Sequence, residues 1–117
     1  MKVNEIINLL DAEVLCGDAF ETEIGSAFGS DMMSDVLAFV NEQALLLTGL
    51  CNPQVVRTAE MMDISCICFV RGKKPDASVV ALAVEKNIML IATKRCMYSA
   101  CGELYKAGLE GNGWKNV

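Results

Sequence analysis

Three apolar runs, each followed by a loop and an amphipathic stretch, organise the second half of the chain. These strand–helix units cover residues 44–62, 65–82 and 88–104. The runs show no alternation of apolar and polar positions, which is typical of strands covered on both faces in a parallel sheet. The pattern predicts strands and helices, in alternating order, at 44–48, 54–62, 65–70, 76–86, 88–92 and 96–107.

The first 43 residues carry shorter patterns that alternate in the same way. They predict a helix over 4–10, short strands over 13–16 and 24–28, and a helix over 31–40. Strands alternating with helices predict right-handed crossovers onto one sheet. We therefore expect an α/β fold with three layers: a mainly parallel sheet, helices on both faces, and short N-terminal strands added. One domain is expected over 1–109, with a flexible C-terminal tail over 110–117.

Helix boundaries are signalled at three places. Ser30 is expected to cap the helix that Asp31 begins, because a hydroxyl accepts from free helix N–H groups. Asn52 before Pro53 is a strong start signal for the next helix. Gly108 sits where a left-handed C-terminal cap would lie. In the helix over 31–40, the spacing predicts four inward side chains: Met32, Val36, Leu37 and Val40.

The composition limits the classes of function. Of 117 residues, 53% are hydrophobic, and the net charge is −5, which disfavours binding to a nucleic-acid backbone. The longest apolar runs are about six residues against the ~20 that span a membrane. No membrane contact is expected, and a cytoplasmic location is expected by default.

Cysteine chemistry and catalysis are weakly supported. There is no histidine and no Cys-x-x-Cys pair, so zinc spacing and the commonest general base are missing. We expect reduced thiols, with Cys66 and Cys68 on one side of a strand, and no cofactor. An exposed Cys51 near a helix start would be the candidate reactive thiol. Three carboxylates, those of Asp31, Asp35 and Glu42, could in principle hold a metal, but an exposed helix face explains them better.

The strand ends suggest a binding edge. Ligands collect beyond the carboxyl ends of parallel strands, where helix N-termini present free N–H groups. Five of the ten basic residues follow such ends. A phosphate-bearing small molecule, an acidic protein surface and a merely solvated edge all fit this pattern. The candidate ligand-binding residues are Thr48, Gly49, Asn52, Arg71, Gly72, Lys73, Lys74, Thr93, Lys94 and Arg95. Gly49 and Gly72 form no Walker A loop and are expected to supply positive φ angles.

Several segments together resemble the DRTGG domain. They are 45–49 (LLLTG) with its following helix, 66–75 and 88–107; the stretches 1–17 and 28–37 are similar to small stand-alone members. Residues 49–52 read Gly-Leu-Cys-Asn where the family often has Gly-Asp-Arg, and 70–72 read Val-Arg-Gly in place of Thr-Gly-Gly. Only Gly49 and Gly72 carry over.

The resemblance implies a fold similar to the N-terminal domain of HPr kinase/phosphorylase and a regulatory role. Similar domains accompany CBS modules in regulated pyrophosphatases. Stand-alone members resemble accessory proteins encoded near regulatory kinases and hydrogenase-type proteins, which would be the candidate partners. Our first hypothesis is a non-enzymatic regulatory and interaction module, expected to be a homodimer. The alternative is a sensor that binds a nucleotide or another phosphorylated small molecule at the basic edge. A thiol-based redox or metal protein ranks third.

Overall fold

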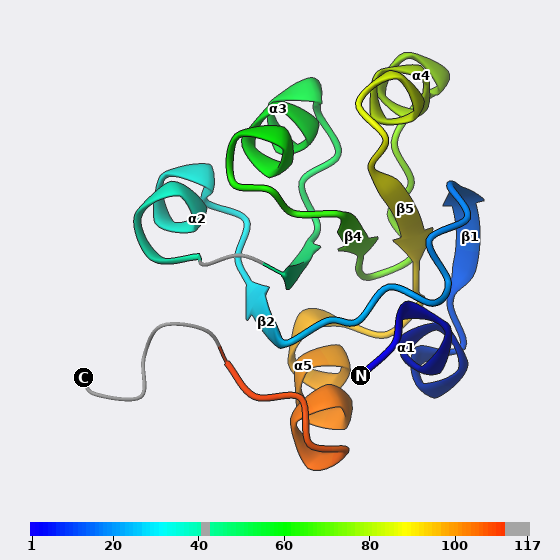
Figure 1. Cartoon of the computed structure of the whole chain (residues 1–117), viewed down its shortest axis with the longest axis vertical. Coiled ribbons are helices and arrows are strands. Elements are labelled where there is room, and N and C mark those ends of the chain that lie inside the picture. Colours follow the sequence, from blue (N-terminus) through cyan, green and yellow to red (C-terminus); the bar gives the residue numbers. More distant parts are fainter. Residues whose placement is uncertain (41–42, 112–117) are drawn as a thin grey trace.

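A five-stranded sheet lies between two layers of helices (Figure 1). The computed structural model describes residues 1–40 and 43–111. Across the sheet, the strands follow the order β1 (Glu13–Cys16), β5 (Met89–Ala92), β4 (Cys66–Phe69), β3 (Ala44–Thr48) and β2 (Ser26–Gly29). The predicted three-layer α/β fold is confirmed.

Four of the five strands are parallel. Strands β2, β3, β4 and β5 pair side by side in the same direction, with Leu45 opposite Cys66 and Cys66 opposite Met89. Strand β1 pairs antiparallel with β5, and Glu13 lies opposite Ala92. As a result, the amino end of β1 lies beside the carboxyl end of β5. This places the segment between the first helix and β1 at the binding edge.

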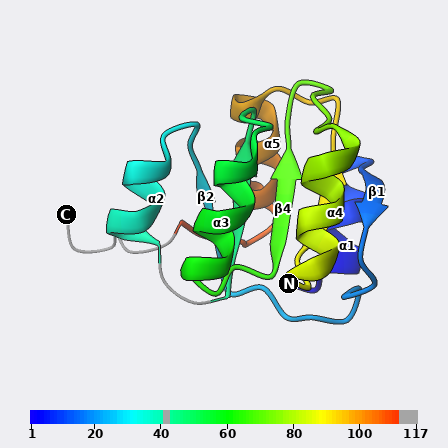
Figure 2. The same cartoon turned by 90° about the horizontal axis from the view of Figure 1, so that it is seen from above.

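The two helical layers bury alternate residues of the same strands. Helices α2 (Met33–Phe39), α3 (Pro53–Met61) and α4 (Ala77–Glu85) cover one face, where Leu46, Ile67 and Leu90 are buried. Helices α1 (Val3–Leu10) and α5 (Met97–Lys106) cover the other face (Figure 2). All five residues of β3 are fully buried, as the run without alternation predicted. Cys66 and Cys68 lie together on the α1–α5 side.

The start of α2 differs from the prediction. The helix begins at Met33, two residues after Asp31, and Ser30 Oγ accepts from the backbone N–H of Met32 at 3.0 Å outside the helix. Asp31 is not in the helix because its carboxylate bonds to the end of β3. The buried face shifts accordingly. Val36 and Val40 are buried as expected, whereas Met33 is buried and Met32 and Leu37 are exposed.

The other two predicted helix boundaries are confirmed. Asn52 stands at the N-cap position of α3 but makes no side-chain capping hydrogen bond within the described residues, and Pro53 is the first residue of the helix. Gly108 has a φ of 106°, and the N–H of Leu109 turns back to the carbonyl of Leu104 at 2.9 Å. Beyond this cap, Glu110 accepts from the N–H of Ala27 in β2 at 3.0 Å. Residues 112–117 lie outside the described part of the chain, so the tail boundary stays a prediction.

The helices are short. The longest, α5, has ten residues, and a membrane crossing needs about 20. Within 1–40 and 43–111, therefore, no helix is long and apolar enough to cross a membrane.

Candidate functional site

The loops that follow β2, β3, β4 and β5 meet at one end of the sheet, which we call the carboxyl edge. Each of the ten residues predicted to bind a ligand is either the last residue of a strand or part of the loop that follows a strand. Because these strands are parallel neighbours, the topology brings the loops to the same edge. The structure divides the residues between two groups, one at β2–β3–β4 and one at β4–β5–β1.

The first group is built around Asp31. Its Oδ1 accepts from the backbone N–H of Gly49 at 2.7 Å and from the Thr48 hydroxyl at 3.1 Å. Thr48 is fully buried, and its Oγ1 in turn accepts from the N–H of Leu50 at 3.1 Å. A carboxylate therefore fills the position at the β3 end where an external anion would have met free N–H groups.

Arg71 completes this group. Its Nη2 lies 3.8 Å from Asp31 Oδ2, and both side chains are about half exposed. The guanidinium also lies over Gly49, where a β-carbon would collide with it. The expectation that Gly49 supplies a positive φ is wrong, because the glycine is needed for the close approach of Arg71. Gly72 does have a positive φ of 68°.

The second group joins the end of α1 to the loop after β5. The buried Thr93 hydroxyl donates to the Leu10 carbonyl at 2.8 Å, and Arg95 Nη1 donates to the same oxygen at 3.2 Å. The last carbonyls of a helix lack intrahelical donors, and a cation there is favoured by the helix dipole. Arg95 therefore caps α1 from another part of the chain.

The remaining cations of the edge differ in their partners. Lys74 Nζ lies 2.8 Å from Glu13 Oε1 at the start of β1. Lys73 and Lys94 form no ion pair within the described residues. Of the five basic side chains on the edge, Arg71, Lys74 and Arg95 are therefore held by oxygens of the protein itself. The edge is much less positive than its lysines and arginines alone suggest.

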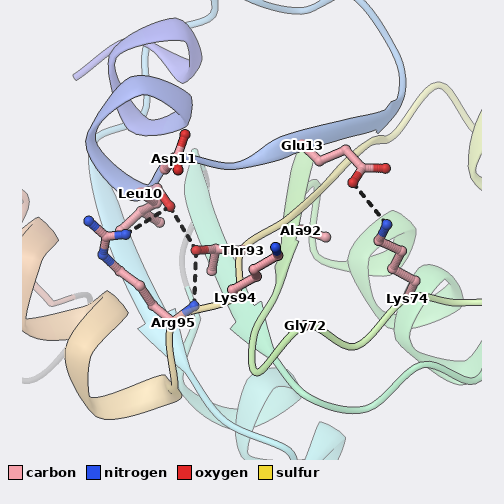
Figure 3. A pocket seen from close by; sticks show the side chains of 9 residues that line it. All are labelled: Leu10, Asp11, Glu13, Gly72, Lys74, Ala92, Thr93, Lys94 and Arg95. Atoms are coloured by element: carbon pink, nitrogen blue, oxygen red, sulfur yellow. Dashed lines mark hydrogen bonds and ion pairs between the residues drawn. The ribbon is translucent and has the colours of Figure 1, made fainter.

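A pocket of about 360 Å³ opens in the second group (Figure 3). We call it the rim pocket. Its walls come from the α1–β1 turn, the β4–α4 loop and the β5–α5 loop, and the residues that line it are Leu10, Asp11, Glu13, Gly72, Lys74, Ala92, Thr93, Lys94 and Arg95. Five of the ten predicted residues line it: Gly72, Lys74, Thr93, Lys94 and Arg95. The other five, Thr48, Gly49, Asn52, Arg71 and Lys73, do not.

Sequence reasoning missed the acidic side of this edge. Asp11 and Glu13 line the rim pocket, and Asp31 holds the first group. Asp11 and Glu13 reach the edge because β1 runs antiparallel to β5, which places the amino end of β1 beside the β5 loop. The direction of β1 cannot be determined from its own residues, so these carboxylates could not be assigned to the edge.

The pKa values of the cysteine thiols depend on how deeply each thiol is buried. Burial raises the pKa of the Cys66 thiol and raises that of Cys68 to about 12. Cys51, the candidate reactive thiol, is half-buried, and burial raises its pKa too. Cys96 is exposed, and hydrogen bonding to the Ser99 hydroxyl and to backbone N–H groups lowers its pKa.

Two of the three carboxylates considered for a metal lie in the described part of the chain. Asp31 bonds to the end of β3, while Asp35 lies within α2. Glu42, the third candidate, lies outside the described residues. Among the residues that are described, no three His, Cys, Asp or Glu side chains are placed to hold a metal ion.

The chain is thus a small three-layer α/β domain, and the loops at its carboxyl edge carry the ion pairs Asp31–Arg71 and Glu13–Lys74. The chain belongs to the DRTGG domain family, whose model matches residues 5–107. A search of curated proteins found no match.

A solved structure has a similar fold. It is the crystal structure of the CBS and DRTGG domains of the regulatory region of Clostridium perfringens pyrophosphatase, complexed with the activator diadenosine tetraphosphate. The match has a TM-score of 0.64 and 18% sequence identity, and it covers 85% of this chain. This chain spans 44% of the length of that one, so the likeness concerns the fold of one part.

Proposed function

We propose that this domain is a non-catalytic regulatory module that acts by self-association as a homodimer. Membership of the DRTGG family supports a regulatory role, since the similar pyrophosphatase structure is described as a regulatory region. The observation that carries the self-association is an exposed apolar surface on α2. A partner protein, such as a regulatory kinase or a hydrogenase-type complex, would distinguish the monomer from the dimer.

The α2 surface consists of three large side chains, two from α2 and one from Met32 at its N-cap position. Met32 is 61% exposed, and Leu37 and Phe39 are each 40% exposed. Helix α2 lies at the end of the molecule where the sheet terminates in β2 (Figure 1). At about 100° per residue, Leu37 and Phe39 flank the buried Val36 on opposite sides of the helix. Large apolar side chains left exposed on one helix are candidates for an interaction site.

Two copies would meet through the same surface. A twofold dimer is self-complementary, so α2 of one copy would pack against α2 of the other. The net charge of −5 works against association, and salt should therefore strengthen the dimer by screening the repulsion.

Light scattering on two matched variants tests the proposal. Leu37→Glu places a charge in the α2 surface, and Val84→Glu places one at a 62% exposed apolar position on α4. Because both positions are exposed, both variants should fold. We expect the first to be monomeric and the second to dimerise like the wild type. Equal association of the two variants would show that α2 is not the dimer interface.

A second function, ligand sensing at the carboxyl edge, is favoured by the rim pocket and by Lys94, which forms no ion pair in the part of the chain that the structure describes. We propose a nucleotide or another phosphorylated small molecule as the ligand. Binding to the native state alone stabilises a protein by about 2.7 kcal/mol at a ligand concentration 100 times Kd. A thermal-shift screen with adenine nucleotides and sugar phosphates measures this directly, and an unchanged melting temperature across the whole screen would reject sensing.

A further inference from the structure

We propose that the rim pocket binds a small phosphate monoester whose organic part carries hydroxyl groups, such as a phosphorylated pentose, with the phosphoryl group on Lys94. This inference rests on the second proposed function and adds to it the location, the orientation and the chemical class of the ligand. It is carried by the arrangement of charged side chains around the pocket (Figure 3).

The walls of the pocket are fixed before any ligand arrives. The N–H of Gly72 donates to the carbonyl of Thr93 at 3.0 Å, which ties the β4–α4 loop to the β5–α5 loop. The Thr93 hydroxyl and Arg95 both donate to Leu10, which ties the second loop to α1. A ligand entering this pocket would not have to order three loops, so little binding energy is lost to ordering.

Lys94 is the cation available to a ligand. Its side chain lies between the Leu10–Thr93–Arg95 contacts and the Glu13–Lys74 pair (Figure 3). It has no ion-pair partner within the described residues, whereas Arg95 is engaged by Leu10. An ammonium, which carries three N–H donors, is suited to a phosphoryl group when it lies at the middle of a pocket.

Lys74 is a second cation within reach. Its pair with Glu13 is more than half exposed on both sides, and such pairs contribute only about 0–1 kcal/mol. A phosphoryl group on Lys94 could therefore draw Lys74 away from Glu13 at little cost. The Glu13 carboxylate, like that of Asp11 on the same wall, would then be available to accept from hydrogen-bond donors on the ligand.

Hydroxyl groups supply those donors. Carboxylates bind sugar hydroxyls in many nucleotide sites, so one phosphoryl group beside a polyol matches the pattern of cations and carboxylates here. The same two carboxylates repel additional negative charge, which disfavours polyphosphates. The volume of about 360 Å³ is at the lower end of the roughly 300–1,000 Å³ of small-molecule sites. Both facts favour a small monophosphate over a long dinucleotide.

The test uses ribose 5-phosphate as the probe, with ribose as the control that lacks the phosphoryl group. Binding is followed by calorimetry and by amide chemical shifts in the loops. Lys94→Ala is compared with Lys73→Ala, which removes another exposed lysine of the same edge that does not line the pocket. Loss of a charged hydrogen bond should weaken binding by about 10-fold or more in the first variant and by less than about 2-fold in the second.

We expect ribose 5-phosphate to bind, ribose to leave the spectrum unchanged, and the shifts to centre on Gly72, Thr93 and Lys94. Equal weakening in the two lysine variants, or shifts centred on Asp31 and Gly49, would overturn the assignment to this pocket. So would a protein that binds adenine nucleotides but not ribose 5-phosphate, although sensing would then stand. If no nucleotide and no sugar phosphate binds, the sensing proposal falls together with the pocket.

Discussion

The guanidinium of Arg71 lies over the Cα of Gly49, with Cζ 3.1 Å and Nε 3.2 Å from the position that a β-carbon on residue 49 would occupy. The same side chain reaches Asp31, whose carboxylate accepts from the N–H of Gly49. Because residue 49 is a glycine, its N–H can bind the Asp31 carboxylate while the Arg71 guanidinium packs against its Cα. The close approach explains a glycine that has no positive φ.

Gly49→Ala should displace Arg71 and change the free energy of unfolding by less than about 1 kcal/mol. The loss of an exposed ion pair costs at most about 1 kcal/mol, and replacing glycine by alanine at an ordinary φ returns about 0.4–1 kcal/mol. In an Arg71→Ala background the collision is gone, so Gly49→Ala should there be stabilising. Urea denaturation of the four proteins measures the difference. An identical effect of Gly49→Ala in both backgrounds would contradict this packing.

Gly17→Ala should be strongly destabilising. Gly17 has a φ of 95°, and an added β-carbon would lie 2.9 Å from the backbone Cα of Met89 in β5. A non-glycine residue in such a conformation costs about 1–3 kcal/mol, and the contact with Met89 adds to this. The matched control is Gly102→Ala in α5, where nothing lies within 4 Å. That change should stabilise the helix by up to about 1 kcal/mol.

Urea midpoints of the two glycine variants decide the point. They should move in opposite directions from the wild type. If both variants lose stability equally, the Gly17 turn does not pack on β5 as described.

Alkylation should label Cys96 first. Its thiol is exposed, and hydrogen bonding to Ser99 lowers its pKa, which raises the thiolate fraction at neutral pH. Cys66 and Cys68 are buried with raised pKa values and should react only after unfolding. Mass spectrometry of partially alkylated native protein gives the order. Ser99→Ala should slow the labelling of Cys96, and faster labelling of Cys51 than of Cys96 would contradict this order of reactivity.

The free energy of unfolding should depend on pH in the acid range because of Asp76. Its carboxylate caps α4 by accepting from the N–H groups of Ser78 and Val79, and hydrogen bonding to the Ser78 hydroxyl is the main reason that its pKa is lowered. A lowered pKa in the folded state means that the stabilisation is present above the unfolded value of about 3.9 and is lost as the pH falls through the folded value.

Asp76→Asn keeps a capping oxygen but removes the titration. The difference in unfolding free energy between wild type and variant should therefore shrink between pH 6 and pH 3. Urea titrations at several pH values measure it, with Ser78→Ala as a variant in which the pKa of Asp76 should rise toward its ordinary value. A difference that stays constant with pH would rule out this role of the carboxylate.

Much of the fold could be predicted because local signals agreed with each other. The unbroken run of β3 predicted burial on both faces, and Asn52 before Pro53 marked the start of α3. Gly108 followed by Leu109 marked the end of α5. Each of these features depends on residues within one turn or one strand of each other, so no tertiary information was needed.

The candidate site was predicted only in part, because it depends on contacts distant in sequence. The loops after β3, β4 and β5 were correctly assigned to one edge from the parallel topology. The pairing of Lys74 with Glu13 joins residues 61 positions apart. Similarly, Asp31 was interpreted as a helix residue because its bonds to Thr48 and Gly49 could not be seen from its neighbours.

Sedimentation equilibrium of the wild-type domain, from low to high micromolar concentration, tests self-association most directly. We predict that the apparent mass rises toward twice the monomer mass of 12.7 kDa as the concentration increases, and that Leu37→Glu holds it at the monomer value. A wild-type mass that stays at 12.7 kDa throughout the series would contradict the proposal that this domain regulates by pairing with itself.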